Sequence, residues 1–381
     1  MHGKVLLLSQ RRISDLVAFC LAYEFEDTFL AVTGAERIDA TDFASIEFSR
    51  RVYKLVRLAS GSPSLAARLA PVPRGNAPLA GDFELFFPIF NNAFELYSLA
   101  TIPDWRKRCR KAACFISEIW TDLLPEYLLE LLSEFDHVFT GLQHCADDVA
   151  RITGRPCSYL PLATDVLRFA PAGTDQPRPI EVCNIGRRSQ VTHRALLADA
   201  ARRNSFYYYD TVAASGADLK QRTFRVDDPQ EHRLMLATIL KHSRYFIANR
   251  SHVNNPEFTA GRDEISARFY EGIAAGTIMI GEAPRTAEFK RQFDWPDVVT
   301  HLPFDSPNVA DILADLNSDP DRLATVRSRN LREAARRHDW LYRIETVFDT
   351  LGLKPTEAMQ ARTERLAQIA RQADAGLRTH A

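Results

Sequence analysis

The chain has 381 residues, of which 46% are hydrophobic, and its 48 basic and 49 acidic residues leave a formal net charge of −1. This length suits two α/β domains of ordinary size, and the balanced charge gives no general electrostatic attraction for nucleic acid. The apolar run near the start is only four residues long, and no later run approaches the roughly 20 apolar residues of a membrane-spanning helix. We therefore expect a cytoplasmic protein that does not bind nucleic acid.

Apolar runs typical of buried strands alternate with helical periodicity through the first half of the chain. This alternation predicts stacked βαβ units and a parallel sheet within an N-terminal domain, residues 1–170. The expected helices are Ser14–Tyr23, Phe43–Leu58 and Pro125–Phe135. The expected strands are Val5–Leu8, Phe29–Val32, Glu84–Ile89, Ala113–Ile116, His137–Phe139 and Ser158–Leu160.

A polar run with three prolines, residues 171–179, interrupts this pattern and is predicted to be an interdomain linker. The alternation then resumes and predicts a second Rossmann-like domain over residues 180–340. A long amphipathic pattern from Pro320 to Leu351 follows, and residues 356–381 are expected to be a solvated helix or a disordered tail. The strands expected in this half are Glu181–Ile185, Phe206–Tyr209, Tyr245–Ala248, Thr277–Ile280 and Val298–Leu302.

Six cysteines are scattered along the chain without a C-x-x-C pair or a histidine at ligand spacing. We therefore expect buried thiols and no disulfide or zinc site. No D-x-D motif stands in a loop suited to Mg²⁺, and no metal site is predicted.

The most informative segment is DEISARFYEGIAAGTIMIGE, residues 263–282. We expect a helix that starts at Asp263, carries a second acid at Glu271 and ends at Gly276, before a buried strand. In such a helix the two acids lie roughly 12 Å apart along the axis, about the span from the sugar to the ribose of a sugar nucleotide. Alternatively, Glu264, Arg268 and Glu271 form only an ion-paired helix face.

This segment resembles the nucleotide-sugar-binding domain of group 1 glycosyltransferases with the GT-B architecture. In that family an acid-x7-acid motif places the first carboxylate near the donor sugar and the second on the ribose hydroxyls, and a run of small residues follows. Asp263 and Glu271 match the two acids, and Gly276 belongs to the small-residue run. Because Asp263 stands where the family usually has Glu, the sugar contact could instead fall on Glu264.

The resemblance implies an α/β fold of the GT-B type, in which two Rossmann-like domains face each other across a cleft. It also implies that a C-terminal helix, residues 341–355, returns to the first domain. The end of the first domain, L-P-L-A-T-D-x-x-x-F, is similar to the family's hinge motif, and Asp165 matches its acid. The alternative role for Asp165 is that of a helix N-cap.

A phosphate site is expected where the strand IEVCNIG ends in Gly186 and two arginines precede a helix. Gly186 allows close approach of a ligand, the helix offers free N–H groups, and Arg187 or Arg188 can neutralise a diphosphate. The family has an arginine at this position that contacts the donor phosphates. In the alternative interpretation, these arginines are ordinary surface residues.

Polar residues after the next strand are further donor-binding candidates, because long polar loops at strand ends are often functional. Asn249, Arg250 and His252 begin the loop that leads to the acidic segment, although ordinary turn and capping roles fit them as well. In the first domain, which by resemblance binds the acceptor, Glu118 at a strand end is a candidate general base. It could equally be a helix cap or a salt-bridge partner.

The predicted activity is transfer of a sugar from a nucleotide-sugar donor, UDP- or GDP-linked, to an acceptor hydroxyl, with retention of configuration and without a metal. The expected catalytic residues are Asp263, Glu264 and Glu118. The expected donor-binding residues are Gly186, Arg187, Arg188, Asn249, Arg250, Arg268, Glu271 and Gly276. No cofactor is expected. The acceptor is a glycan, a lipid-linked sugar or a protein, and peripheral membrane association is a further expectation. The alternatives are a catalytically silent sugar-nucleotide scaffold or sensor, and a GT-B nucleotide-sugar epimerase.

Overall fold

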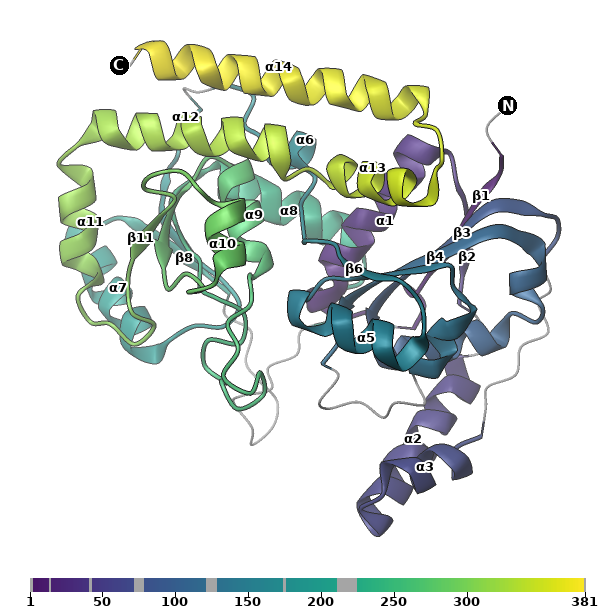
Figure 1. The fold of residues 1–381 in the computed structure, drawn as a ribbon. Helices are drawn as coiled ribbons and strands as arrows, with labels where there is room; N and C mark the ends of the chain where they lie inside the picture. The colour runs from purple at the N-terminus through teal and green to yellow at the C-terminus, as the bar shows by residue number, and fades with distance from the viewer. Residues whose placement is uncertain are drawn as a thin grey trace. The chain divides into compact units, whose positions relative to one another are not determined.

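The computed structural model describes residues 3–13, 15–40, 43–71, 79–120, 129–173, 176–210 and 225–379 (Figure 1). The chain divides into two compact units. Unit 1 comprises Met1–Leu162, Arg225–Pro229 and Arg343–Gln360, and unit 2 comprises Ala163–Phe224, Gln230–Tyr342 and Ala361–Ala381.

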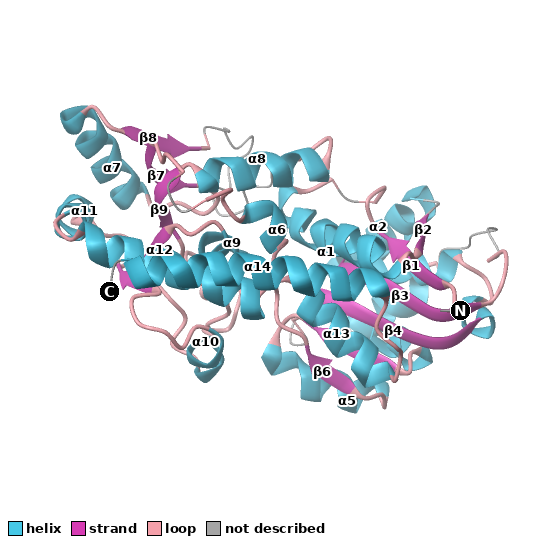
Figure 2. Cartoon of the chain, turned by 90° about the horizontal axis from the view of Figure 1, so that it is seen from above, coloured by secondary structure: helices cyan, strands magenta, loops and turns pink. Residues whose placement is uncertain are grey.

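Unit 1 is built on a six-stranded parallel sheet with the order β2-β1-β3-β4-β5-β6 (Figure 2). Its inner strands are almost wholly buried, which explains why they appear in the sequence as continuous apolar runs. The strands are β1 (Val5–Ser9), β2 (Glu36–Asp39), β3 (Phe83–Asn92), β4 (Cys109–Glu118), β5 (His137–Thr140) and β6 (Cys157–Tyr159). The α-helices are α1 (Cys20–Thr33), α2 (Phe43–Ser60), α3 (Pro63–Leu69) and α5 (Ala146–Thr153).

Three expectations for unit 1 need correction or restriction. The strand predicted at Phe29–Val32 is wrong, because these residues form the last turns of α1, which Gly34 closes with a left-handed backbone (φ 66°). The helix expected at Ser14–Tyr23 begins only at Cys20. Residues 125–128 of the expected Pro125–Phe135 helix lie outside the described residues, and Leu131–Glu134 is a 3-10 turn.

Unit 2 contains a five-stranded parallel sheet with the order β11-β10-β9-β7-β8. Each of the five strands predicted from the sequence overlaps one of these. The strands of the structure are β7 (Ile180–Asn184), β8 (Phe206–Tyr209), β9 (Ser243–Ile247), β10 (Ile278–Gly281) and β11 (Val299–His301). The accompanying helices are α6 (Val166–Phe169), α7 (Gln190–Arg203), α8 (Pro229–Lys241), α9 (Ala267–Ala274), α10 (Ala287–Gln292), α11 (Val309–Asn317) and α12 (Pro320–Arg337).

The amphipathic pattern after Pro320 forms α12 and α13 (Trp340–Leu351), which are separated at His338 and Asp339. From Arg343 onward α13 belongs to unit 1, where the Arg343 guanidinium donates hydrogen bonds to the carbonyls of Pro161 and Leu162. Residues 356–381 were expected to be a solvated helix or a disordered tail, and the structure has a helix there, α14 (Glu357–Thr379). This helix buries Leu366, and its Asp374 pairs with Arg336 of α12 at 2.7 Å.

The predicted α/β class with two Rossmann-like units is confirmed by these two parallel sheets. Within the described helices, no apolar stretch is long enough to cross a lipid bilayer.

Candidate functional site

The candidate site lies at the carboxyl ends of the strands of unit 2. Strand β7 pairs with β8 on one side and with β9 on the other, so the connection from β8 to β9 crosses β7 and the strand order changes direction there. Ligands of open parallel sheets bind in the crevice outside the carboxyl ends of the strands at such a switch point. A ligand of unit 2 is therefore expected to contact the residues that follow β7 and β9.

Gly186 forms the turn that follows β7. Its φ of 82° lies in the left-handed region, and its N–H donates a hydrogen bond to Asp210 Oδ2 at 3.2 Å. A Cβ at this position would lie 3.4 Å from Nη2 of Arg268. The left-handed backbone conformation therefore favours glycine at position 186, whereas an added Cβ would be in ordinary van der Waals contact with Arg268. Three residues later Ser189 caps helix α7 by accepting the Thr192 N–H.

The two arginines after Gly186 occupy different environments. Arg187 is exposed and contacts Asn254 Oδ1 at 3.1 Å and His252 Nδ1 at 3.2 Å. The Arg188 side chain is only 9% exposed, pairs with Asp210 at 3.1 Å and lies over the Tyr209 ring. Arg188 is thus held in a fixed orientation, whereas Arg187 presents its charge at the surface.

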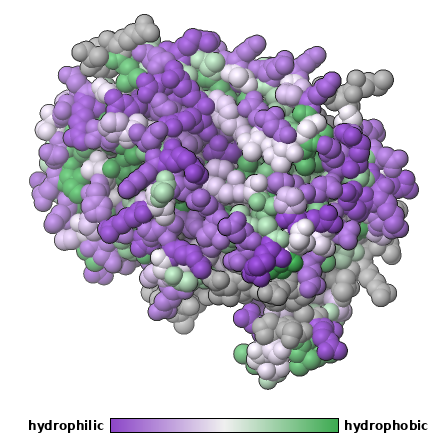
Figure 3. Space-filling view, in the orientation of Figure 1, coloured by the Kyte–Doolittle hydropathy of each residue, from purple (hydrophilic) through white to green (hydrophobic). Residues whose placement is uncertain are grey.

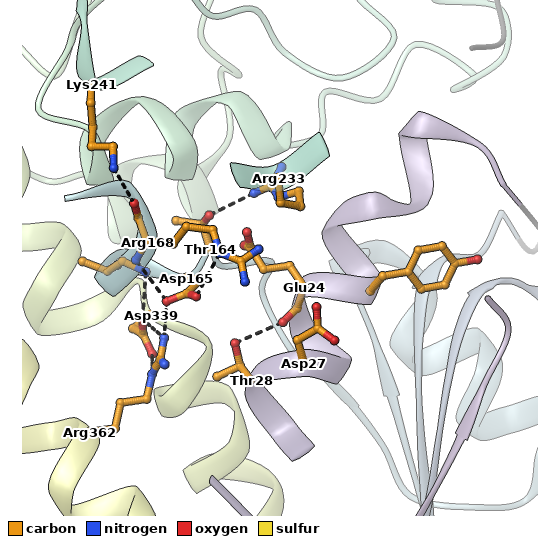
Figure 4. Close-up of polar contacts among 12 residues, drawn as sticks. Glu24, Asp27, Thr28, Thr164, Asp165, Arg168, Arg233, Lys241, Asp339 and Arg362 are labelled. Carbon is orange, nitrogen blue, oxygen red and sulfur yellow. Dashed lines mark hydrogen bonds and ion pairs between the residues drawn. The ribbon is translucent and has the colours of Figure 1, made fainter. Parts of the chain in front are cut away.

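Arg268 adds a third guanidinium to this turn. It lies in the first turn of α9, and its Nη1 donates to Glu271 Oε2 at 2.7 Å. Glu271 is 1% exposed and also pairs directly with Arg233 of α8, which donates to the Thr164 hydroxyl (Figure 4). Burial opposes ionisation of Glu271, but the charges of Arg268 and Arg233 lower its pKa to about 2.

Glu271 is therefore ionised at neutral pH and lies behind Arg268. Since two arginines already share its carboxylate, its most direct effect is to fix the Arg268 side chain beside Gly186. Contact between Glu271 and a ribose stays a prediction.

The expected helix start at Asp263 is wrong. Helix α9 begins at Ala267, and residues 263–266 are irregular, so the axial spacing calculated for two acids on one helix does not apply. Hydrogen bonds to neighbouring loops hold this stretch outside the helix. The Asp263 carboxylate accepts the Arg285 N–H, the Glu264 carbonyl accepts the Ser251 N–H, and the Ser266 hydroxyl donates to the Asn249 carbonyl.

Asp263 and Arg250 nevertheless lie together at the carboxyl edge of the sheet. Arg250 Nη1 is 3.3 Å from Asp263 Oδ1, and its Nε is 3.1 Å from Oε1 of Glu282, which directly follows β10. The Asn249 side chain accepts the Glu282 N–H. These contacts join the loop after β9 to the loop after β10.

Asn249 also lines a small pocket at this edge. The walls come from the ends of β7 and β9, the start of α7 and the loop after β11: Asn184, Ser189, Thr192, Ile247, Asn249, Leu302, Pro303 and Phe304. Ser189 donates to Asp305 Oδ1 at 2.6 Å, and Thr192 donates to the Phe304 carbonyl, so the loop after β11 is fastened to α7.

Gly276 lies elsewhere. It closes α9 with a φ of 63° at the amino end of β10, where an added Cβ would meet Leu331 and Arg178. This edge of the sheet is opposite to the one that carries Gly186. The geometry therefore does not support donor binding by Gly276 and explains the glycine by chain reversal and packing.

Asp165 has the capping role expected as its alternative. It accepts the Arg168 N–H at the start of α6, and its carboxylate pairs with Arg362 of α14 at 2.6 Å (Figure 4). Arg362 also pairs with the buried Asp339, whose Oδ2 accepts the Val166 N–H. The segment after Leu162 is thus fastened to α14 within unit 2.

In unit 1, Glu118 ends β4 and accepts the indole N–H of Trp120 at 2.6 Å. A second group of polar residues lies at the ends of β1 and β3 and was missed from the sequence. Glu95 is buried and accepts the Asn91 N–H at 2.6 Å, and the buried Glu26 accepts the Ser9 hydroxyl and pairs with Arg11 at 2.8 Å. Burial raises the pKa of Glu95 to about 8, partly opposed by the Asn91 hydrogen bonds.

Two acidic residues of the unit 2 site were also missed from the sequence, although their positions after strands could have indicated them. Asp210 follows β8 directly and Glu282 follows β10 directly, so both are acids at the carboxyl ends of parallel strands. The rule that drew attention to Gly186 and Asn249 would have found them. Among the described residues, no group of three His, Cys, Asp or Glu side chains is arranged to hold a metal ion.

Residues 187–349 match a family model described as glycosyl transferase-like. A search of curated proteins finds no match.

Among solved structures, an α-glucosyltransferase in complex with UDP and DNA is similar at 11% identity and a TM-score of 0.48, covering 92% of this chain and 99% of that one. S. aureus TarM with UDP has 8% identity and a TM-score of 0.43, over 69% of this chain and 55% of TarM. A UDP-N-acetylglucosamine 2-epimerase-like protein of Listeria monocytogenes has 8% identity and a TM-score of 0.40, over 89% and 92%.

The alignment with a chain of the GtfA/B complex spans 58% of that chain, so this protein matches little more than half the length of some of these structures. Over residues 187–349, less than half of the chain, the resemblance to glycosyltransferases predicted from the sequence is confirmed by the family match.

Proposed function

We propose that this protein transfers a glycosyl unit from a UDP- or GDP-sugar to an acceptor hydroxyl, with retention and without a metal. The observation that carries the proposal is that Arg268 reaches the left-handed Gly186 turn at the end of β7, which Arg187 and Arg188 directly follow in the chain. Cleavage of the bond to the donor sugar leaves negative charge on a nucleoside diphosphate. Positive groups already oriented toward that charge stabilise the transition state.

The three arginines have different roles in this proposal. Arg187 is exposed and binds the diphosphate from the solvent side. Arg268 and Arg188 are oriented by Glu271 and Asp210, so less side-chain entropy is lost when they bind phosphate. The N–H groups at the start of α7 complete the anion site.

The uncharged part of the donor is proposed to occupy the carboxyl edge beside these arginines. Asn249, which lines the small pocket at this edge, offers a side-chain amide for a hydrogen bond to the nucleoside. Asp263 lies with Arg250 at the same edge, where its carboxylate can accept a hydrogen bond from a sugar hydroxyl. Glu264 stays the alternative for that contact, and Glu118 of unit 1 stays the proposed general base for the acceptor.

Incubation of the full-length protein with a panel of UDP- and GDP-sugars tests this function. We expect slow release of one nucleoside diphosphate in the absence of acceptor and faster release with a suitable sugar, lipid-linked or protein acceptor. The test variant is Arg187→Ala, which should lose this activity. The matched control is Arg202→Ala, which should keep it, because Arg202 is a 72% exposed arginine on α7 that pairs with Asp199.

Proton NMR of the recovered donor distinguishes the alternatives. An unchanged sugar together with free nucleoside diphosphate supports transfer or hydrolysis. Conversion to a sugar of inverted configuration would indicate an epimerase. Donor binding without release, across the acceptor panel, would indicate a sugar-nucleotide scaffold or sensor and would overturn the proposal.

A further inference from the structure

Helices α2 and α3 form a hairpin in unit 1, and its described side chains are buried along one face and exposed along the other. Gly61 (φ 66°) turns the chain between the helices, and Ser62 caps α3 by accepting the Leu65 N–H. The inner face buries Tyr53, which clusters with Ala66 and Ala70 and contacts Phe94. This packing fixes the hairpin on unit 1 and leaves the opposite face open.

The open face carries large apolar side chains. Five of the eleven exposed large hydrophobic residues in the described part of the chain lie on this hairpin of two short helices: Phe48, Leu55, Leu58, Leu65 and Leu69. Leu58 is 86% exposed and Leu55 is 66% exposed. An exposed hydrophobic patch of this kind is typical of a surface that binds another protein or a membrane.

Along α2 the apolar side chains form a stripe that contains a basic residue. Phe48, Arg51, Leu55 and Leu58 follow one another at intervals of three and four residues, so they share one helix face. Arg51 is 73% exposed, and its only acidic neighbour here is Glu47, one turn away. Long basic side chains can place their alkyl stems among apolar groups and keep the charge in the polar layer.

The hairpin is also strongly basic. It has five basic residues and one acidic residue, namely Arg50, Arg51, Lys54, Arg57 and Arg68 against Glu47. Since the whole chain has a formal charge of −1, this excess is local. In the space-filling view, hydrophilic and hydrophobic side chains lie side by side over α2 and α3, at the bottom of the molecule (Figure 3).

The exposed apolar residues and the positive charge of the hairpin together distinguish between two binding partners, a second copy of the chain and a membrane. A second copy of the chain packed through the same face would bring two basic surfaces together, which is unfavourable. A bilayer with anionic lipids offers negative headgroups for the arginines and lysine and an apolar layer for the leucines and Phe48. We propose that the α2–α3 hairpin docks this protein on an anionic membrane surface, and the inference does not depend on the donor site of unit 2.

Vesicle sedimentation with the full-length protein tests the proposal. Wild type should pellet with phosphatidylcholine vesicles that contain phosphatidylglycerol, should not pellet with phosphatidylcholine alone, and should be released as the salt concentration rises. Each of two double variants, Leu55→Ser with Leu58→Ser and Arg51→Glu with Lys54→Glu, should weaken vesicle binding about tenfold or more.

The matched control is Leu234→Ser with Met235→Ser, which removes two exposed apolar side chains from α8 of unit 2. It should bind vesicles as wild type does. Because every substituted residue is exposed, circular dichroism and Tm should stay close to wild type, and either double variant alone suffices if the other fails to fold.

The proposal is overturned by equal binding of wild type and both double variants, by equal binding to neutral vesicles, or by no vesicle binding. Light scattering, which measures the oligomeric state, can also contradict the proposal. If Leu55→Ser with Leu58→Ser abolishes a dimer, and wild type does not bind vesicles, then the hairpin is an interface between copies.

Discussion

Arg268 Nη1 lies 2.7 Å from Glu271 Oε2, three residues further along α9. Glu271 is buried and shares its carboxylate with Arg233, which is itself 2% exposed. The position of Arg268 beside Gly186 thus depends on a buried ion pair between α8 and α9. A site at the carboxyl edge of the sheet is in this way connected to the packing of the helices behind it.

Glu271→Ala should destabilise the protein strongly. The change leaves Arg233 as a buried cation without its carboxylate, and removal of one partner of a buried pair costs about 3 to 5 kcal/mol. Chemical denaturation measures the free energy of unfolding. Glu364→Ala, an exposed glutamate on α14, is the control and should change it by less than about 0.5 kcal/mol. Equal stability of the two variants would show that the Glu271 pair is not structural.

Gly186→Ala should impair nucleotide binding more than its effect on stability explains. A non-glycine residue at a φ of 82° costs about 1 to 3 kcal/mol, and the new methyl group also meets Arg268 at 3.4 Å. Gly34→Ala is the matched control, because Gly34 has a φ of 66° and nothing within 4 Å of the added Cβ. Both variants should lower Tm, but only Gly186→Ala should lose affinity for a nucleoside diphosphate. Loss of affinity in both, or in neither, would contradict the placement of the phosphates at this turn.

Stability should fall as the pH rises toward 8, in part because of Glu95. Burial raises its pKa from an ordinary value of 4.5 to about 8, so the native state keeps a proton that the unfolded state releases. Between these two values each pH unit lowers the free energy of unfolding by up to about 1.4 kcal/mol. Below pH 4.5 both states are protonated, and this dependence vanishes.

Glu95→Gln removes this titration, so its unfolding free energy should fall less steeply than that of wild type between about pH 5 and about pH 8. Denaturation midpoints across this range measure the difference. The neighbouring Glu26, whose pKa burial raises to about 7, keeps a residual slope in the variant. Identical slopes in both proteins would show that Glu95 does not titrate in this window.

Much of the fold could be predicted because buried parallel strands are continuous apolar runs, as in Val5–Ser9 and Ile278–Gly281. Prediction of strands from apolar runs failed where a strand is polar or where an apolar run belongs to a helix. Glu36–Asp39 is a polar edge strand and was missed, whereas Phe29 and Val32, which suggested a strand, are apolar because they lie on the buried side of α1.

The candidate site was predictable only in part. Gly186 and Asn249 were identified because they follow strands directly, and the structure brings Arg187 and Arg188 to the same edge as Asp263 and Arg250. Local sequence could not show that Arg233 pairs with Glu271, 38 residues away, or that Arg268 reaches Gly186. The helix start at Asp263 failed because hydrogen bonds to other loops, to Arg285 and Ser251, outweigh the local preference.

The proposed activity requires that a nucleoside diphosphate bind at the arginines around Gly186. Isothermal titration of UDP and GDP into wild type, Arg187→Ala and Arg202→Ala tests it most directly. We predict that one nucleotide binds wild type and Arg202→Ala equally. Binding to Arg187→Ala should be about 10-fold to 100-fold weaker, as expected for loss of a charge-assisted hydrogen bond of about 1.5 to 3 kcal/mol. Equal affinity of all three proteins, or no binding of either nucleotide by wild type, would contradict the claim.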